Sequence, residues 1–279
     1  MKIWIFKFQG VSSLVILITI TFLVLNWVFV ILTDVLGYSS IIYQEILQGH
    51  PIPLLWFHLF GEGSLTEIFQ WTALATSFLI STYCHISLKV KGKKEIAYFF
   101  FLVGTGVLLM FLEDTLNIRH KFGIYLGEVA GYSYLRNPVK IATEFLFYTL
   151  IGTLMVFPLW KYWRFLSLSR RTKTILIIGY SSYFIASVAS ASRYLMSWYD
   201  LVGGAFISFL PLQNVTAWEM AANNLEQTEM YPLGFWLMDY LFEESIELVG
   251  AGFLLAFFLT YAFERNHLSR ASCIAKKPR

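Results

Sequence analysis

The sequence has few charged residues, and this shortage excludes a soluble globular protein. Asp, Glu, Lys and Arg make up 14% of the 279 residues, and hydrophobic residues make up 57%, whereas a soluble domain carries about 25% charged residues. The two cysteines, Cys84 and Cys273, give neither a metal-finger spacing nor a disulfide framework. P-loop, dinucleotide-binding and H-E-x-x-H motifs are absent, and nothing in the sequence indicates nucleic-acid binding. What remains is a chain dominated by long apolar runs.

Six of these runs are long enough to cross a bilayer, which takes about 20 residues. We therefore predict an all-α polytopic membrane protein. Its six transmembrane helices should form one bundle, a single integral membrane domain over residues 1–279. The predicted spans are 11–33, 66–88, 95–116, 141–162, 174–197 and 235–263.

Lysine and arginine are missing from two loops, 34–65 and 198–234. Because cytoplasmic loops of membrane proteins are enriched in these residues, both loops are predicted to lie outside. With six spans, sixteen basic residues fall on the inner side: Lys2, Lys7, Lys89, Lys91, Lys93, Lys94, Lys161, Arg164, Arg170, Arg171, Lys173, Arg265, Arg270, Lys276, Lys277 and Arg279. Five fall on the outer side: Arg119, Lys121, Arg136, Lys140 and Arg193. We expect both termini in the cytoplasm.

Ionisable side chains are rare inside the spans, and those present share one depth. A carboxylate within a span costs about 3 kcal/mol even on the lenient insertion scale, so such residues are usually functional. Because alternate spans run in opposite directions, all of these groups fall in the outer half of the membrane or at its outer edge. They are Glu67, Glu113, Asp114, Glu144, Arg193, Asp239, Glu243, Glu244 and Glu247.

Helical spacing groups some of these acids further. Residues three, four or seven apart lie on one face of an α-helix. Asp239, Glu243 and Glu247 are four residues apart and should form a stripe on the last span. Glu113 and His120 share a face if the third helix continues between them. The pattern predicts an acidic polar chamber that opens outward.

Several carboxylates cannot share a low-dielectric site while all are ionised and unpaired. Some can be protonated, Arg193 or Arg119 can pair with them, or a divalent metal ion can bind between them. Carboxylates with one imidazole suit a hard or borderline divalent metal. Its candidate ligands are Glu113, Asp114, His120, Glu243, Glu244 and Glu247.

Three functions fit such a chamber. The first is a membrane enzyme, metal-dependent or not, that acts on a lipid or lipid-linked substrate at the outer leaflet. The candidate catalytic residues are Glu113, His120, Glu243 and Glu247, and the candidate substrate-binding residues are Arg193 and Glu144. The second is a proton- or cation-coupled transporter, because intramembrane acids also form ion pathways. The third is a scaffold or assembly subunit whose acids pair with bases on another membrane protein.

Three short segments carry a resemblance to known proteins. They are GEGSLTEIFQW entering the second span, FLEDTLNIRH ending the third and FEESIELVG in the last. This order resembles uncharacterised bacterial multi-pass membrane proteins of about six spans, which have an acidic pair ending one helix and a later E-E-x-x-E helix. The resemblance implies a bacterial inner membrane protein and carries no activity. The paired histidines of alkaline-ceramidase-type membrane hydrolases are missing near the C-terminus.

Overall fold

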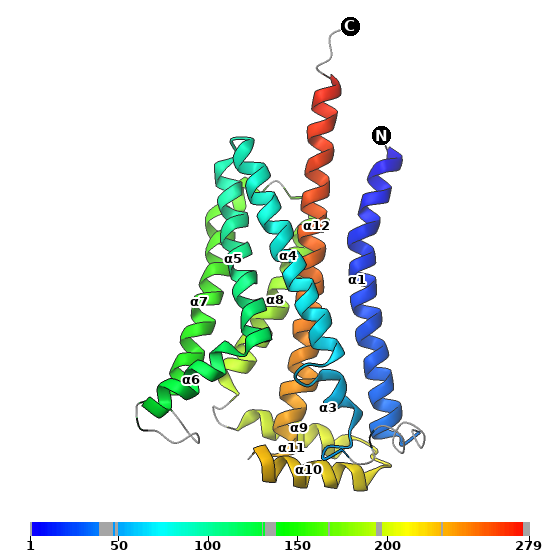
Figure 1. Ribbon diagram of the computed structural model, residues 1–279. Helices are drawn as coiled ribbons and strands as arrows, with labels where there is room; N and C mark the ends of the chain where they lie inside the picture. Colours follow the sequence, from blue (N-terminus) through cyan, green and yellow to red (C-terminus); the bar gives the residue numbers. More distant parts are fainter. Residues whose placement is uncertain are drawn as a thin grey trace. The chain divides into compact units, whose positions relative to one another are not determined.

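The computed structural model describes residues 2–38, 47, 50–129, 131, 138–166, 168–193, 197–229 and 231–275, and every regular element in these ranges is helical (Figure 1). The predicted all-α class is therefore confirmed. The elements are α1 (Lys2–Val30), η1 (Ile31–Val35), α3 (Leu55–Phe60), α4 (Leu65–Val90), α5 (Lys94–Leu116), α6 (Ile118–Val129), α7 (Pro138–Tyr162), η3 (Trp163–Phe165), α8 (Arg170–Ser192), α9 (Trp198–Phe209), α10 (Val215–Glu229), α11 (Leu233–Trp236), η4 (Leu237–Glu243) and α12 (Glu244–Ala275).

Five helical stretches are long and apolar enough to cross a membrane, as an integral membrane protein requires. They are Gly10–Val35, Lys94–Leu116, Ile141–Phe165, Arg170–Ser192 and Leu233–Phe263. Each matches a predicted span to within a few residues. The remaining predicted span, 66–88, forms α4, which has 26 residues but is not among these five. The count of six spans stays a prediction.

Contacts between Cα atoms divide the chain into two compact units, and the predicted single domain stays a prediction. Unit 1 comprises Met1–Leu17, Trp71–Phe184 and Gly250–Arg279. Unit 2 comprises Ile18–Gln70 and Ile185–Val249. Four helices, α1, α4, α8 and α12, contribute residues to both units.

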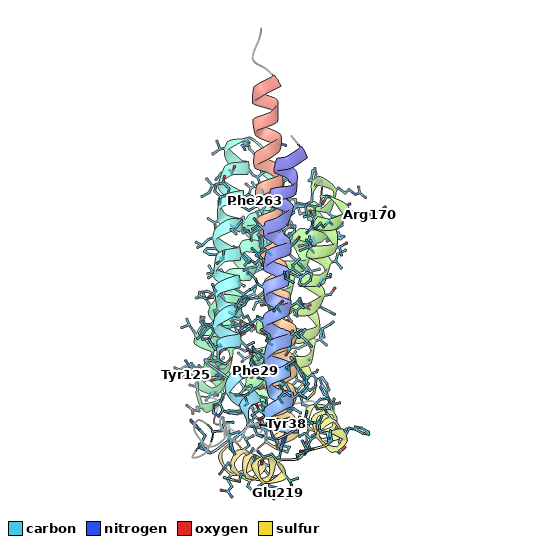
Figure 2. The ribbon with its side chains drawn as sticks, turned by 90° about the vertical axis from the view of Figure 1, so that its right-hand side faces the viewer. Phe29, Tyr38, Tyr125, Arg170, Glu219 and Phe263 are labelled. Carbon is cyan, nitrogen blue, oxygen red and sulfur yellow. The ribbon has the colours of Figure 1, made fainter. Side chains whose placement is uncertain are left out.

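Unit 1 is a set of long helices around an aromatic core. In it α5 packs against α7, and the short helix α6 covers α7 as well (Figure 1). Phe99, Phe100 and Phe257 are fully buried, and the Phe100 ring contacts the Tyr261 ring of α12 at a tilt of 45°, with centroids 4.5 Å apart. Figure 2 shows Arg170 and Phe263 towards one end of this unit and Tyr125 of α6 towards the other.

Polar contacts in unit 1 show how its helices run. The Ser81 hydroxyl donates to the Phe100 carbonyl at 2.6 Å, and the His85 ring lies 2.8 Å from the Ala97 carbonyl. The partner number falls as the α4 number rises, so α4 and α5 are antiparallel. By the same reasoning α8 and α12 are antiparallel, because Gly179 lies against Leu254 and Tyr183 lies against Gly250.

Unit 2 has its own core, built by short helices around the first turns of the chain's last helix. Trp56 and Phe60 of α3, Trp218 of α10 and Leu237 of η4 are among its buried residues. Figure 1 shows α9, α10 and α11 side by side in this unit. Glu219 lies on α10 and is exposed (Figure 2).

Asp34 organises the start of unit 2. Its two carboxylate oxygens accept the backbone N–H groups of Leu55 and Trp56, both at 2.8 Å. These are the first residues of α3, whose N–H groups have no partner within the helix. The backbone carbonyl of Asp34 accepts the Trp218 indole N–H at 2.8 Å. One buried residue thus joins η1, α3 and α10.

Helices α9 and α11 cross at a pair of glycines, and this contact yields a stability prediction. A Cβ atom on Gly203 would lie 2.0 Å from the Gly234 carbonyl oxygen, whereas a Cβ on neighbouring Gly204 would meet nothing within 4 Å. We expect Gly203→Ala to lower the stability of the protein by about 1–3 kcal/mol, because the two helices must separate. Gly204→Ala is the matched control and should be neutral or stabilising, since Ala is the better helix former. Thermal unfolding in detergent measures both, and equal midpoints would contradict the crossing.

A second prediction concerns the Asp34 carboxylate. Asp34→Ala should lower stability by about 2–4 kcal/mol, because two buried N–H groups of α3 lose their acceptor and each unmet group costs about 1–3 kcal/mol. Asp200→Ala provides the control, since Asp200 is half-buried in the first turn of α9 and its loss should cost about 0.5 kcal/mol. Thermal unfolding of the two variants should therefore differ clearly. Equal losses would show that Asp34 does not anchor α3.

Candidate functional site

The acids of the last span start in a stretch of π-helix. The helix that begins with α11 continues through η4, Leu237–Glu243, which is π-helical, and then through α12. A π-helix closes i→i+5 turns, is rare, and often lies at functional sites. Asp239 and Glu243 both lie inside this wider turn, so their directions differ from those in a regular α-helix.

Two buried hydrogen-bonded pairs lie together on η4. Arg193 donates from Nη1 to Oδ1 of Asp239, and the Tyr199 hydroxyl donates to Oε2 of Glu243. The Arg193 and Asp239 side chains are both largely buried. Burial, reinforced by the Glu243 carboxylate, raises the pKa of the Tyr199 hydroxyl, so this phenol stays a neutral donor at physiological pH. An ion pair and a carboxyl–phenol pair therefore occupy the same turn.

The next acid along the helix has a third kind of partner. Oε2 of Glu247 accepts a hydrogen bond of 2.8 Å from Nε2 of Gln70, which lies on α4. Glu244, the first residue of α12, is half-buried. Unit 2 thus meets each acid of the predicted stripe with a different donor: a guanidinium, a phenol and an amide.

In unit 1, Glu113 forms an ion pair with Arg119, one of the two bases that the sequence offered as partners for the acids. Oε1 of Glu113 lies 3.1 Å from Nε of Arg119, and both residues are buried. The Arg119 guanidinium also covers the Tyr148 ring at 4.5 Å. The helix does not continue between Glu113 and His120, because Asn117 adopts a left-handed backbone conformation that ends α5. The prediction of one helical stripe for these two residues was wrong.

The other candidate residues of unit 1 are described by their burial and by their position on the helices. Asp114 is half-buried near the end of α5. His120 lies in α6, and its side chain is outside the described part of the structure. Glu144 is 3% exposed and lies in the second turn of α7, so it is a buried acid and not a first-turn acid at a helix end.

The candidate residues divide between the two units. Arg193, Glu243, Glu244 and Glu247 belong to unit 2, whereas the candidates between residues 113 and 144 belong to unit 1. The chamber that would join both sets stays a prediction.

The predicted divalent metal ion has no observed ligand set. Among the residues that the structure describes, no group of three or more His, Cys, Asp or Glu side chains could hold a metal ion. In unit 2, acids of the stripe have protein donors as partners instead. The metal ion stays a prediction.

Two histidines of the first predicted outer loop lie together in unit 2. The rings of His50 and His58 are 4.9 Å apart, and Nε2 of His58 donates to the Ile52 carbonyl at 3.0 Å. Burial lowers the pKa of His58, and the neighbouring His50 adds to this effect. The pair is local to the α3 segment.

Sequence reasoning offered Arg193 and Arg119 as partners of the acids but missed the uncharged ones. Tyr199 and Gln70 were not candidates, although both supply hydrogen bonds to the predicted stripe. A signal for Gln70 was present, because an amide inside an otherwise apolar helix needs a polar partner. Tyr199 stood among many aromatic residues and had no distinguishing signal. Glu67, by contrast, acts locally at the start of α4, where its carboxylate accepts the Gly63 N–H.

Comparison with protein-family models, with curated proteins and with solved structures found no match for this chain.

The buried ion pair yields a third prediction. Arg193→Gln and Asp239→Asn should each lower stability by about 3–5 kcal/mol, because each leaves the other charge buried and uncompensated. The double variant should be more stable than the sum of the single losses predicts, since neither charge then remains. Unfolding of the four proteins in detergent gives the coupling energy. Strictly additive losses would show that the two side chains do not interact.

Proposed function

We propose that the protein crosses the membrane six times, with both termini on the cytoplasmic side of a bacterial plasma membrane. The sixth span would be α4. At 26 residues it is about 39 Å long, more than the roughly 30 Å of the hydrocarbon core. Its contacts with α5, a candidate span, support an antiparallel crossing.

The polar residues of α4 are compatible with a span. The hydroxyls of Thr76 and Ser77 donate to carbonyls one turn back, those of Thr72 and Ala73. A hydroxyl satisfied within its own helix does not need water. The scarcity of Lys and Arg in 34–65 and 198–234 supports the orientation.

We propose further that the polar cluster on η4 is the active site of a membrane enzyme that acts on a lipid or lipid-linked substrate. The observation that carries this proposal is the side-by-side presence of Arg193–Asp239 and Glu243–Tyr199. Arg193 is a cation that suits an anionic head group, because guanidinium binds phosphate and carboxylate oxygens in pairs. Glu243 is a carboxyl group that can exchange a proton.

Each residue then has a role that its contacts support. Glu243 serves as general acid or base, and the Tyr199 hydroxyl bonded to it orients the carboxyl group. Asp239 holds the guanidinium of Arg193 in place. Glu247, fixed by Gln70, is a second proton acceptor one turn further along. A divalent metal ion held by the predicted carboxylates would add Lewis acidity.

A proton- or cation-coupled transporter is the second candidate, and one observation favours it. Asp239, Glu243 and Glu247 follow one another along a single helix, each with a hydrogen-bond partner. Such a row of carboxyl groups is how proton relays are built. A transporter differs from an enzyme because it needs a continuous path for protons or cations through the protein.

Glu243→Gln distinguishes the two candidates. The full-length protein in phospholipid vesicles should alter a lipid or a lipid-linked phosphate, followed by mass spectrometry, and the variant should lose about 100-fold or more of this rate, as expected when a general acid or base is removed. Glu219→Gln, a change on the exposed face of α10, is the control and should keep full activity. Metal analysis of both proteins tests the metal ion.

The opposite outcome is equally definite. If the lipids remain unchanged while a pH-sensitive dye inside the vesicles reports a proton flux that Glu243→Gln abolishes, the protein is a transporter and the enzyme proposal is wrong.

A further inference from the structure

The helix α9 is apolar on every side, although much of it is exposed. Its 12 residues, WYDLVGGAFISF, contain one charged residue, Asp200. One face packs into unit 2 through Tyr199 and Gly203. The opposite face presents Leu201 at 67% exposure and Phe209 at 86%. A helix that is hydrophobic all round belongs in an apolar environment, so the exposed face needs an apolar partner.

The length of α9 limits how this helix can lie in a membrane. Twelve residues make a helix of about 18 Å, and the hydrocarbon core of a bilayer is about 30 Å thick. The helix is therefore too short to cross a membrane. It can lie in the plane of the membrane, at the boundary between acyl chains and head groups, as apolar surface helices do.

The neighbouring helix α10 shows the opposite character. Its exposed residues include Glu219, Asn223 and Glu226, and Ala217, Ala221 and Leu225 are buried. The helix has a polar outer face of the ordinary amphipathic kind. In unit 2, α9 thus presents a surface suited to an apolar environment, and α10 presents a surface suited to water.

The chemistry of the exposed face of α9 favours lipid over another protein. The end of α8 in the same unit also exposes apolar side chains, since Ile185 is 53% exposed and Val188 is 51% exposed. Both surfaces are apolar, as lipid-facing surfaces of spans are. The one hydroxyl on the exposed face, that of Ser208, donates to the Ala205 carbonyl at 2.7 Å, so the face offers no donor that a protein partner would need to meet.

The start of α9 fits the same arrangement. The Trp198 indole N–H donates to the Ser192 carbonyl at the end of α8, at 3.1 Å. Tryptophan is enriched at the level of the lipid head groups, where its ring meets apolar chains and its N–H meets polar groups. This bond ties the first residue of α9 to the last residue of a candidate span.

We propose that α9 is an in-plane membrane helix, whose exposed face inserts among the phospholipids of the leaflet in which α8 ends. The inference does not depend on the enzymatic role of the polar cluster. It depends only on the chain being an integral membrane protein.

Fluorescent labels at single cysteines test the proposal. In a background lacking Cys84 and Cys273, an environment-sensitive dye is attached at Leu201→Cys or at Ser208→Cys, and the full-length protein is placed in vesicles of phosphatidylethanolamine and phosphatidylglycerol. We expect nitroxide lipids to quench both positions, more strongly with the nitroxide near the head group than with it at the chain end. Aqueous iodide should quench neither.

Two control positions show how the quenchers act on a lipid-facing and on a water-facing side chain. Ile185→Cys on α8 should be quenched by nitroxide lipids, and Asn223→Cys on α10 should be quenched by iodide only. The proposal is overturned if iodide quenches the α9 labels as it quenches Asn223→Cys. It is also overturned if neither agent quenches them, in which case cross-linking between copies would identify a protein partner. Agreement between Leu201→Cys and Ser208→Cys guards against a local folding defect at either position.

Discussion

Unit 2 depends on the need to give every carboxylate in an apolar helix a donor. An ionised carboxylate without a partner costs several kcal/mol in a low-dielectric interior, so the elements around the last helix are arranged to supply donors. Arg193, just beyond α8, meets Asp239, and α9 turns back so that Tyr199 reaches Glu243. The glycine crossing of α9 and α11 permits this close return. The arrangement of the helices in unit 2 thus follows from the positions of a few charged side chains.

The helices could be predicted because their signal is local. Length and apolar composition alone define a span, and the last predicted span, 235–263, agrees with Leu233–Phe263. The boundary of one predicted span differs from that of its helix. The fifth predicted span, 174–197, extends beyond Ser192, the last residue of α8, and its residues 194–196 lie outside the part of the chain that the structure describes. Composition does not reveal where a backbone leaves the helical conformation.

The acids and their charged partners, Arg193 and Arg119, could be predicted from the sequence, but their uncharged partners could not. A carboxylate in an apolar run stands out in the sequence, whereas the donors Tyr199 and Gln70 are 44 and 177 residues away from the acids they meet. Such pairings are properties of tertiary packing. The break at Asn117 was missed although the residue type is a signal, because Asn is one of the few residues besides Gly that adopt a left-handed conformation. Asp34 was missed because it was counted as the first residue of an outer loop and not as a cap for α3.

The contacts between the first and last helices set the order in which the chain can be assembled during synthesis. In unit 1, Ser12 is hydrogen-bonded to Thr260, 248 residues later, and in unit 2, Trp27 is bonded to Ser245, 218 residues later. The first helix therefore leaves the ribosome long before its partner exists and must wait in the bilayer, surrounded by lipid. It is suited to this wait, because only 17% of its most apolar window is buried in the finished protein. A chain that lacked the last helix would leave Ser12 and Trp27 of the first helix without these two hydrogen-bond partners.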